Sequence, residues 1–258
     1  MTPVIPAPAA TLALLRTRGA LEVLLTQRHH ASRFAGGDYV FPGGKIEADD
    51  NPADAVAWCR GLTALSAAAR LGLDDARAAV GYWVGALRES FEEVGVLLAY
   101  DAGGGFVEPR GERFAEYRRA CHTDNRAFWD MIRAERLTLA TDRLVYFAHW
   151  ITPEENPIRF DTRFFAAELP PGQEAVADDK EIIAVRWLTP PEALAARRRG
   201  EISLRSPTIK NLELLALAPT IPELLARLSA REVRAIRPRV IKEGETQRVL
   251  LPGDPGYF

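Results

Sequence analysis

The stretch RESFEEVGV, residues 88–96, indicates most about both the fold and the chemistry of this chain. At roughly 100° per residue, a helix would bring Glu89, Glu92 and Glu93 within about 100° of one another on one face. The opposite face would carry apolar side chains: Leu87, Phe91 and Val94. The stretch therefore predicts a helix with one side in a hydrophobic core and the other side concentrating negative charge.

Three carboxylates on one helix face favour a bound cation. Like charges three or four residues apart destabilise a helix by a few tenths of a kcal/mol per pair, unless a positive charge offsets them. A hard divalent ion such as Mg²⁺ suits this face, because it takes carboxylate oxygens and completes its shell with water and phosphate oxygens. The alternative is a solvated acidic face with Arg88 as its partner.

The residues upstream favour the cation. Phe41-Pro42-Gly43-Gly44-Lys45-Ile46-Glu47 precedes the acidic stretch in the order seen in the Nudix box, G-x5-E-x7-R-E-U-x-E-E-x-G-U, whose second half residues 88–96 match. On these two motifs the chain resembles the Nudix hydrolases, which split diphosphate bonds with water.

This resemblance implies both a fold and a metal site. It implies an α/β/α sandwich with a mixed sheet, and a cofactor that is Mg²⁺ or Mn²⁺. Glu92 and Glu93 would ligate the metal, Glu89 would bind or orient it, the Gly44 carbonyl would join its shell, and Arg88 would hold the carboxylates in place. In similar enzymes the general base often comes from a later loop.

Several residues depart from the box or leave a role open. Asp50 stands where the box has glutamate, and Ser90 stands where an aliphatic residue is usual. Between Asp50 and Arg88 lie 37 residues in place of seven, and closing this longer loop costs only about 1.5 kcal/mol. Glu181 and Asp179 are the candidates for the general base.

Residues 24–44, LLTQRHHASRFAGGDYVFPGG, are similar to the coenzyme A diphosphatase signature L-L-T-x-R-(S/A)-x3-R-x3-G-x3-F-P-G-G, with His29 at a position that is normally small. The long insertion in the box also resembles the peroxisomal coenzyme A diphosphatases. Arg28 and Arg33 would then bind the substrate, including its 3'-phosphate, through charge-assisted hydrogen bonds. Lys45 is a further substrate-binding candidate. The alternative is that both arginines are surface residues flanking a strand.

The rest of the sequence predicts strands alternating with helices. Strands are expected at 10–15 and 21–27, joined as a hairpin, and at 38–41, 144–152, 163–168 and 181–188. A helix from Asn51 to Ala69 would take Asn51 as its N-cap and end near Gly72, and a second would run from Asp74 to a C-cap at Gly95.

Further helices are expected within 111–136, with a break near 122–124, and after Pro191 through Ala196. The tail beyond Ser206 should add one or two helices and an irregular end. We therefore expect an α/β fold with a mixed sheet, in one domain over residues 1–258, with a helical insertion at about 51–80 and a helical C-terminal extension at about 206–258.

Composition excludes some classes of protein. The net charge of -2 provides no field that would attract nucleic acid or an anionic membrane, so we expect neither as a partner. The small-molecule diphosphate substrate is what the resemblance to Nudix hydrolases implies. Cys59 and Cys121 lack the spacing of a zinc site and are expected to be buried thiols. No stretch approaches the length of a membrane span and no basic leader precedes the first apolar run, which predicts a cytoplasmic protein. A homodimer is left open.

The function favoured by these residues is metal-dependent cleavage of coenzyme A or an acyl-coenzyme A into 3',5'-ADP and a phosphopantetheine. One alternative is a diphosphatase for ADP-ribose, a dinucleotide or a nucleotide sugar. Another is a non-catalytic nucleotide sensor, a class that typically loses the box carboxylates; all three are present in this sequence.

Overall fold

The computed structural model describes residues 4–32, 34–243 and 246–257, and a mixed sheet forms the centre of this part of the chain. The strands follow the order β10-β7-β8-β1-β2-β3, with β4 beside β1 and β9 beside β2. They are β1 (Ala7–Arg18), β2 (Ala20–Arg28), β3 (Tyr39–Val40), β4 (Gly43–Lys45), β7 (Val145–Ile151), β8 (Phe160–Glu168), β9 (Ile182–Leu188) and β10 (Ala235–Ile236). Because β1 pairs parallel with β8 and antiparallel with β2 and β4, the expected mixed sheet is confirmed.

Strand β1 links the two hydrophobic cores. Its side chains alternate between the faces of the sheet, so that Leu12 and Leu14 enter one core and Ala13 and Leu15 enter the other. Gly19, with φ of 77°, provides the left-handed turn into β2, which confirms the predicted hairpin.

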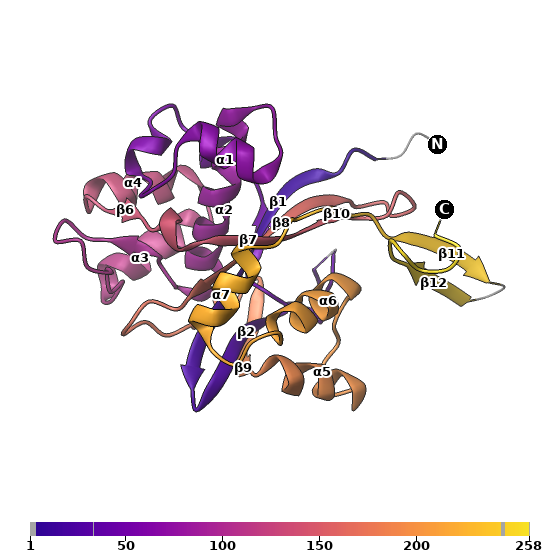
Figure 1. The fold of residues 1–258 in the computed structure, drawn as a ribbon. Helices are drawn as coiled ribbons and strands as arrows, with labels where there is room; N and C mark the ends of the chain where they lie inside the picture. Colours follow the sequence, from indigo (N-terminus) through magenta and orange to yellow (C-terminus); the bar gives the residue numbers. More distant parts are fainter. Residues whose placement is uncertain (1–3, 33, 244–245, 258) are drawn as a thin grey trace.

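Helices cover both faces of the sheet (Figure 1). One group packs on the Leu12 face: α1 (Ala64–Leu71), α2 (Ala76–Val94), α3 (Glu112–Cys121) and α4 (Arg126–Ala134). The other group packs on the Leu15 face: α5 (Pro190–Arg198), α6 (Ser206–Leu215) and α7 (Ile221–Ser229). This three-layer arrangement is the α/β/α sandwich that the sequence predicts.

Helix α2 begins and ends where the sequence predicts. The Asp75 carboxylate accepts hydrogen bonds from the backbone N–H groups of Arg77 and Ala78, each at 2.9 Å, and so satisfies two free donors of the first turn. Gly95 closes the helix in the left-handed conformation, with φ of 71°.

The helix predicted from Asn51 to Ala69 is wrong in its first half. Two 3-10 turns, η1 (Ala48–Asp50) and η2 (Ala55–Trp58), flank residues 51–54, and α1 starts only after Thr63. Thr63 and Ser66 cap the helix through reciprocal hydrogen bonds. Asn51 instead donates to the Arg77 carbonyl at 2.8 Å, so a contact with α2 replaces the expected N-cap.

The remaining predictions are confirmed, including the helices beyond Ser206, which are α6 and α7, but the end of the chain after α7 differs from the prediction. Helices α3 and α4 confirm the interrupted helical stretch, and β3, β7, β8, β9 and α5 confirm the other expected elements. The end of the chain is not irregular: β10 joins the sheet, and β11 (Arg239–Glu243) and β12 (Thr246–Leu250) form a hairpin that projects from the body (Figure 1). The shorter elements are β5 (Ala99–Tyr100), β6 (Thr138–Leu139) and η3 (Thr141–Arg143). None of the described helices combines the length and the apolar character needed to cross a membrane.

The N-cap of α2 gives a test of this fold. We expect Asp75→Ala to lower the free energy of unfolding by about 1 kcal/mol, because two backbone donors lose their acceptor. The measurement is the midpoint of urea unfolding. Asp74→Ala, at the exposed neighbouring position, is the matched control and should change the midpoint little; equal losses in the two variants would contradict the assigned cap.

Candidate active site

The last two turns of α2 contain the acidic stretch, and they direct its apolar side chains into the core and its glutamates toward the site. Phe91 and Val94 are buried in the core of the α2 face. Glu89, Glu92 and Glu93 lie on the other side of the helix, toward β4 and the loop before it. The two-sided helix predicted from residues 88–96 is therefore present in the fold.

A buried guanidinium holds three acidic side chains together. Arg88, only 2% exposed, donates to both carboxylate oxygens of Asp50, with Nε to Oδ1 at 2.6 Å and Nη2 to Oδ2 at 3.1 Å. Its Nη1 lies 3.0 Å from Glu92 Oε2 and 2.9 Å from Glu89 Oε1, and its Nη2 also donates to the Lys45 carbonyl at 3.0 Å. Asp50 thus reaches Arg88 despite its shorter side chain.

The two glycines of β4 let the backbone approach these carboxylates closely. A Cβ at Gly44 would lie 2.5 Å from Glu89 Oε1, so a larger residue would displace that carboxylate. The Gly43 N–H donates to Glu93 Oε2 at 3.0 Å. Gly43 is required for a different reason, because a Cβ there would lie 2.4 Å from the Ala10 carbonyl oxygen of β1. The backbone of the pair forms a glycine wall beside Glu89 and Glu93.

The cluster carries more negative than positive charge. Four carboxylates, Asp50, Glu89, Glu92 and Glu93, face two guanidinium groups, Arg28 and Arg88. Burial, reinforced by the neighbouring carboxylates, raises the pKa of Glu89 to about 7 and that of Glu92 to about 8, and it also raises the pKa of Glu93. Raised pKa values mean that the charged forms are disfavoured, and a further cation would favour them.

Two oxygens of the cluster fit such a cation. Glu92 Oε1 and Glu93 Oε1 are buried and accept no hydrogen bond in the described structure, which is costly for a carboxylate oxygen. Within the described ranges no three Asp, Glu, His or Cys side chains converge as a ready-made metal cluster. Arg88 and Gly43 donate hydrogen bonds to the other oxygens of Glu92 and Glu93. The donor chemistry, all carboxylate oxygen, suits a hard divalent ion.

Arg28 and Glu181 lie together beside Glu93. The Arg28 guanidinium is 3.7 Å from Glu93 Oε1 and 3.9 Å from Glu181 Oε2. Asp178 shapes the turn that carries Glu181, since its carboxylate accepts from the N–H groups of Glu181 at 3.1 Å and Ile182 at 2.8 Å. Glu181 lines the pocket described below, whereas Asp179 is exposed and is not part of the pocket lining.

Arg118 of α3 is a site residue that no sequence motif predicted. Its guanidinium donates to the carbonyls of Glu92 at 2.9 Å, Glu93 at 2.8 Å and Val176 at 2.8 Å. A cation bound to the last carbonyls of a helix also offsets the helix dipole. No sequence motif predicts this contact, because Arg118 binds backbone carbonyls that lie in two other segments of the chain.

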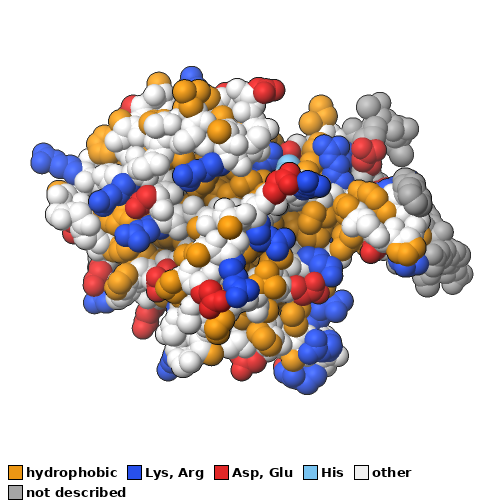
Figure 2. Space-filling model, in the orientation of Figure 1, with side chains coloured by type: hydrophobic (Ala, Val, Ile, Leu, Met, Phe, Trp, Pro, Cys, Tyr) orange, Lys and Arg blue, Asp and Glu red, His pale blue; other side chains and the backbone are white. Residues whose placement is uncertain are grey.

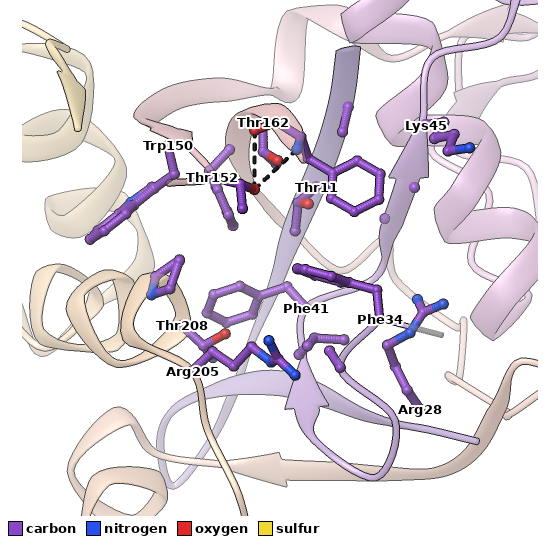
Figure 3. Close-up of a pocket in the computed structure, with 18 of the residues that line it drawn as sticks. Thr11, Arg28, Phe34, Phe41, Lys45, Trp150, Thr152, Thr162, Arg205 and Thr208 are labelled. Carbon is purple, nitrogen blue, oxygen red and sulfur yellow. Dashed lines mark hydrogen bonds between the residues drawn. The ribbon is translucent and has the colours of Figure 1, made fainter. Parts of the chain in front are cut away.

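A pocket of about 790 Å³ extends from the acidic cluster across the sheet. In Figure 3, Arg28 and Lys45 lie on one side of the pocket, Trp150 and Thr208 lie on the other, and the Phe34 ring stands between them. Arg33, the second arginine of the expected signature, lies outside the described residues. The cluster therefore forms one end of a cavity large enough for a nucleotide-derived ligand.

Comparison with known proteins agrees with this geometry. The acyl-coenzyme A diphosphatase NUDT19 of Gallus gallus is 28% identical over 284 residues, covering 92% of this chain and 72% of that protein. The protein of the same name from Homo sapiens is 27% identical over 275 residues, with the same shares of both chains. The crystal structure of a Nudix hydrolase from Alicyclobacillus acidocaldarius superimposes with a TM-score of 0.73 and 25% identity, covering 89% of this chain and 99% of that one.

A family model extends this similarity over more than half of the chain. The model described as the NUDT19 Nudix domain matches residues 74–215 of the 258. This range includes α2 with its three glutamates, Arg118 and the turn that carries Glu181. The chain therefore belongs to the NUDT19 Nudix domain family and is a Nudix hydrolase.

Proposed function

We propose that this enzyme cleaves the diphosphate of coenzyme A or an acyl-coenzyme A into 3',5'-ADP and a phosphopantetheine. The observation that carries the proposal is that Glu89 and Glu92 line one end of a large pocket together with Gly43 and Gly44. The adjacent Glu93 accepts the hydrogen bond from the Gly43 N–H. The name of the NUDT19 relatives and the signature in residues 24–44 support the choice of substrate.

The proposed metal is Mg²⁺ or Mn²⁺. Glu92 and Glu93 would hold it through the oxygens that accept no hydrogen bond, with Glu89 and the Gly44 carbonyl as further ligands. When bound, it would neutralise the charge that develops on the diphosphate during hydrolysis. Arg88 keeps the carboxylates in place, as its hydrogen bonds to Asp50 and Glu92 indicate.

Two side chains at the pocket wall are proposed to act on the reactants. Arg28, which lies beside Glu93 and Glu181, binds diphosphate oxygens. Glu181 accepts a proton from the attacking water, whose oxygen bonds to one phosphorus while the other phosphorus keeps the bridging oxygen. Lys45 and Arg33 remain proposed substrate-binding residues, and Lys45 lines the pocket.

A small molecule is a better partner for this surface than a nucleic acid or a membrane. Basic and acidic side chains are interspersed over the face shown in Figure 2. The net charge is -2. A phosphate-bearing substrate would then be attracted by the local cations of the pocket.

The metal assignment predicts a large loss in Glu93→Gln. The amide can still accept the hydrogen bond from Gly43, so the fold should persist, but the charge is lost. Indirect changes at metal sites cost about 10- to 100-fold in activity, so loss of a ligand should cost more. The measurements are kcat/KM and Mn²⁺ titration, with exposed Glu116→Gln as the matched control. Near-normal turnover of the folded variant at saturating metal would refute the assignment.

The general base is tested by comparing Glu181 with Asp179. We expect Glu181→Gln to lower kcat by roughly 10²- to 10⁴-fold, the usual contribution of a positioned base. Asp179→Asn should have little effect, since Asp179 is not part of the pocket lining. Steady-state kinetics over a pH range distinguish the two, and equal effects would exclude Glu181 as the base.

The substrate is tested by assaying coenzyme A, dephospho-coenzyme A and ADP-ribose with Mg²⁺ and with Mn²⁺, and identifying the products by mass. We expect coenzyme A to be favoured and to release 3',5'-ADP. Arg28→Ala should reduce kcat/KM for coenzyme A and dephospho-coenzyme A alike, by roughly 10- to 150-fold, because the proposed contact is with the diphosphate. A preference for ADP-ribose would favour the alternative substrate class.

A further inference from the structure

Beyond Phe34 the pocket continues into a part that we call the apolar limb. It is lined by Phe41, Trp150, Phe164, Leu204, Ile209 and Val240. These residues come from the sheet, from α6 with the segment before it, and from β11, so that three separate parts of the fold surround one space. In Figure 2 hydrophobic side chains gather where the C-terminal hairpin leaves the body of the molecule.

Three polar groups around the apolar limb are already paired within the protein, whereas Arg197, which also lines the pocket, is exposed and has no side-chain partner among the described residues. Arg205 donates to Asp38 Oδ2 at 2.6 Å and lies 4.9 Å over the Phe34 ring. The Trp150 indole donates to Asn211 Oδ1 at 3.2 Å. The Thr152 hydroxyl accepts from the Phe160 N–H at 3.0 Å, one of the contacts drawn in Figure 3. A ligand entering the limb would therefore meet mainly apolar surface.

The hydrogen bonds and ion pair around the limb bear on which end of the proposed substrate it would bind: the adenine with its 3'-phosphate, or the acyl chain. An adenine has a polar edge that loses its hydrogen bonds to water on burial, and a 3'-phosphate needs cations that are not already neutralised. Arg205 does not meet that need, because Asp38 holds it, and this leaves Arg197 as a single exposed cation in that part of the described lining. An acyl chain requires only apolar surface removed from water.

We infer that the apolar limb binds the acyl chain of an acyl-coenzyme A whose diphosphate lies at the acidic end of the same pocket. The inference rests on the proposed function and adds the site that selects among its substrates. The continuity of the limb with the carboxylate cluster supports it, because one pocket contains both.

Ile209 is the residue whose size should set the acyl-chain preference. It is half-buried on α6 and lines the limb. A larger side chain there would occupy space that the chain needs. Its neighbour Lys210 is exposed and lies outside the pocket lining, which makes it a matched position for the same substitution.

The experiment compares kcat/KM for coenzyme A and for its acetyl, octanoyl and dodecanoyl thioesters. We expect the wild-type enzyme to favour octanoyl over acetyl by at least about tenfold, since even one methylene in an apolar pocket changes specificity by about that factor. Ile209→Trp should reduce the octanoyl-to-coenzyme A ratio by at least about tenfold, whereas Lys210→Trp should keep the wild-type ratio. Circular dichroism verifies that both variants fold.

Two other results would overturn the inference about the apolar limb, and a third would overturn the proposed function. Equal kcat/KM for all thioesters in the wild-type enzyme would overturn the inference and leave the proposed function standing; this arm needs no variant. Equal losses for coenzyme A and octanoyl-coenzyme A in Ile209→Trp would show that the limb holds another part of the substrate, and would also overturn the inference. Failure to cleave any coenzyme A compound, with ADP-ribose cleaved, would overturn the proposed function itself.

Discussion

The buried guanidinium of Arg88 is the constraint on which the site depends. A charge this deeply buried is costly unless it is paired and its donors are satisfied. Arg88 meets that requirement with partners from three segments: Asp50 in η1, the Lys45 carbonyl in β4, and Glu92 one turn along α2. Loss of Asp50 would leave the Arg88 Nε without its acceptor, whereas Glu89 and Glu92 share the Nη1. The same contacts that offset the cost of burial therefore fix the helix, the glycine wall and the loop relative to one another.

This arrangement also explains how the box accommodates its insertion. Asp50 and Arg88 are 38 positions apart in sequence, yet they are joined by two hydrogen bonds. The intervening chain is fastened separately: α1 packs on α2, Asn51 bonds to Arg77, and the Trp129 indole of α4 donates to the Asp49 carbonyl at 2.8 Å. Since both ends of the inserted segment are tied down, its length adds little disorder to the carboxylate cluster.

Sequence patterns predicted the helix limits and the hairpin correctly where residues close together in sequence determine the structure. The limits of α2 follow from Asp75 and Gly95, and the β1 to β2 hairpin follows from alternation around Gly19. The Asn51 N-cap failed because a distant contact with Arg77 competed with helix formation. Arg118 and the neighbours of Arg28 were not predictable, because they meet the site only after segments far apart in sequence pack together.

Arg118 shows how one such unpredicted contact can control the geometry of the chemistry. Its guanidinium joins the carbonyls of Glu92 and Glu93, at the end of α2, to that of Val176, in the segment leading to the turn that carries Glu181. The proposed metal ligands and the proposed base thus lie on two segments joined by this side chain and by a hydrogen bond from the Val176 N–H to the Val94 carbonyl at 2.9 Å. A base must stay within hydrogen-bonding reach of its water. The segment between α2 and β7 showed no functional motif in the sequence. It therefore contributes through Arg118, which helps to position the glutamates of α2 relative to the turn that carries Glu181.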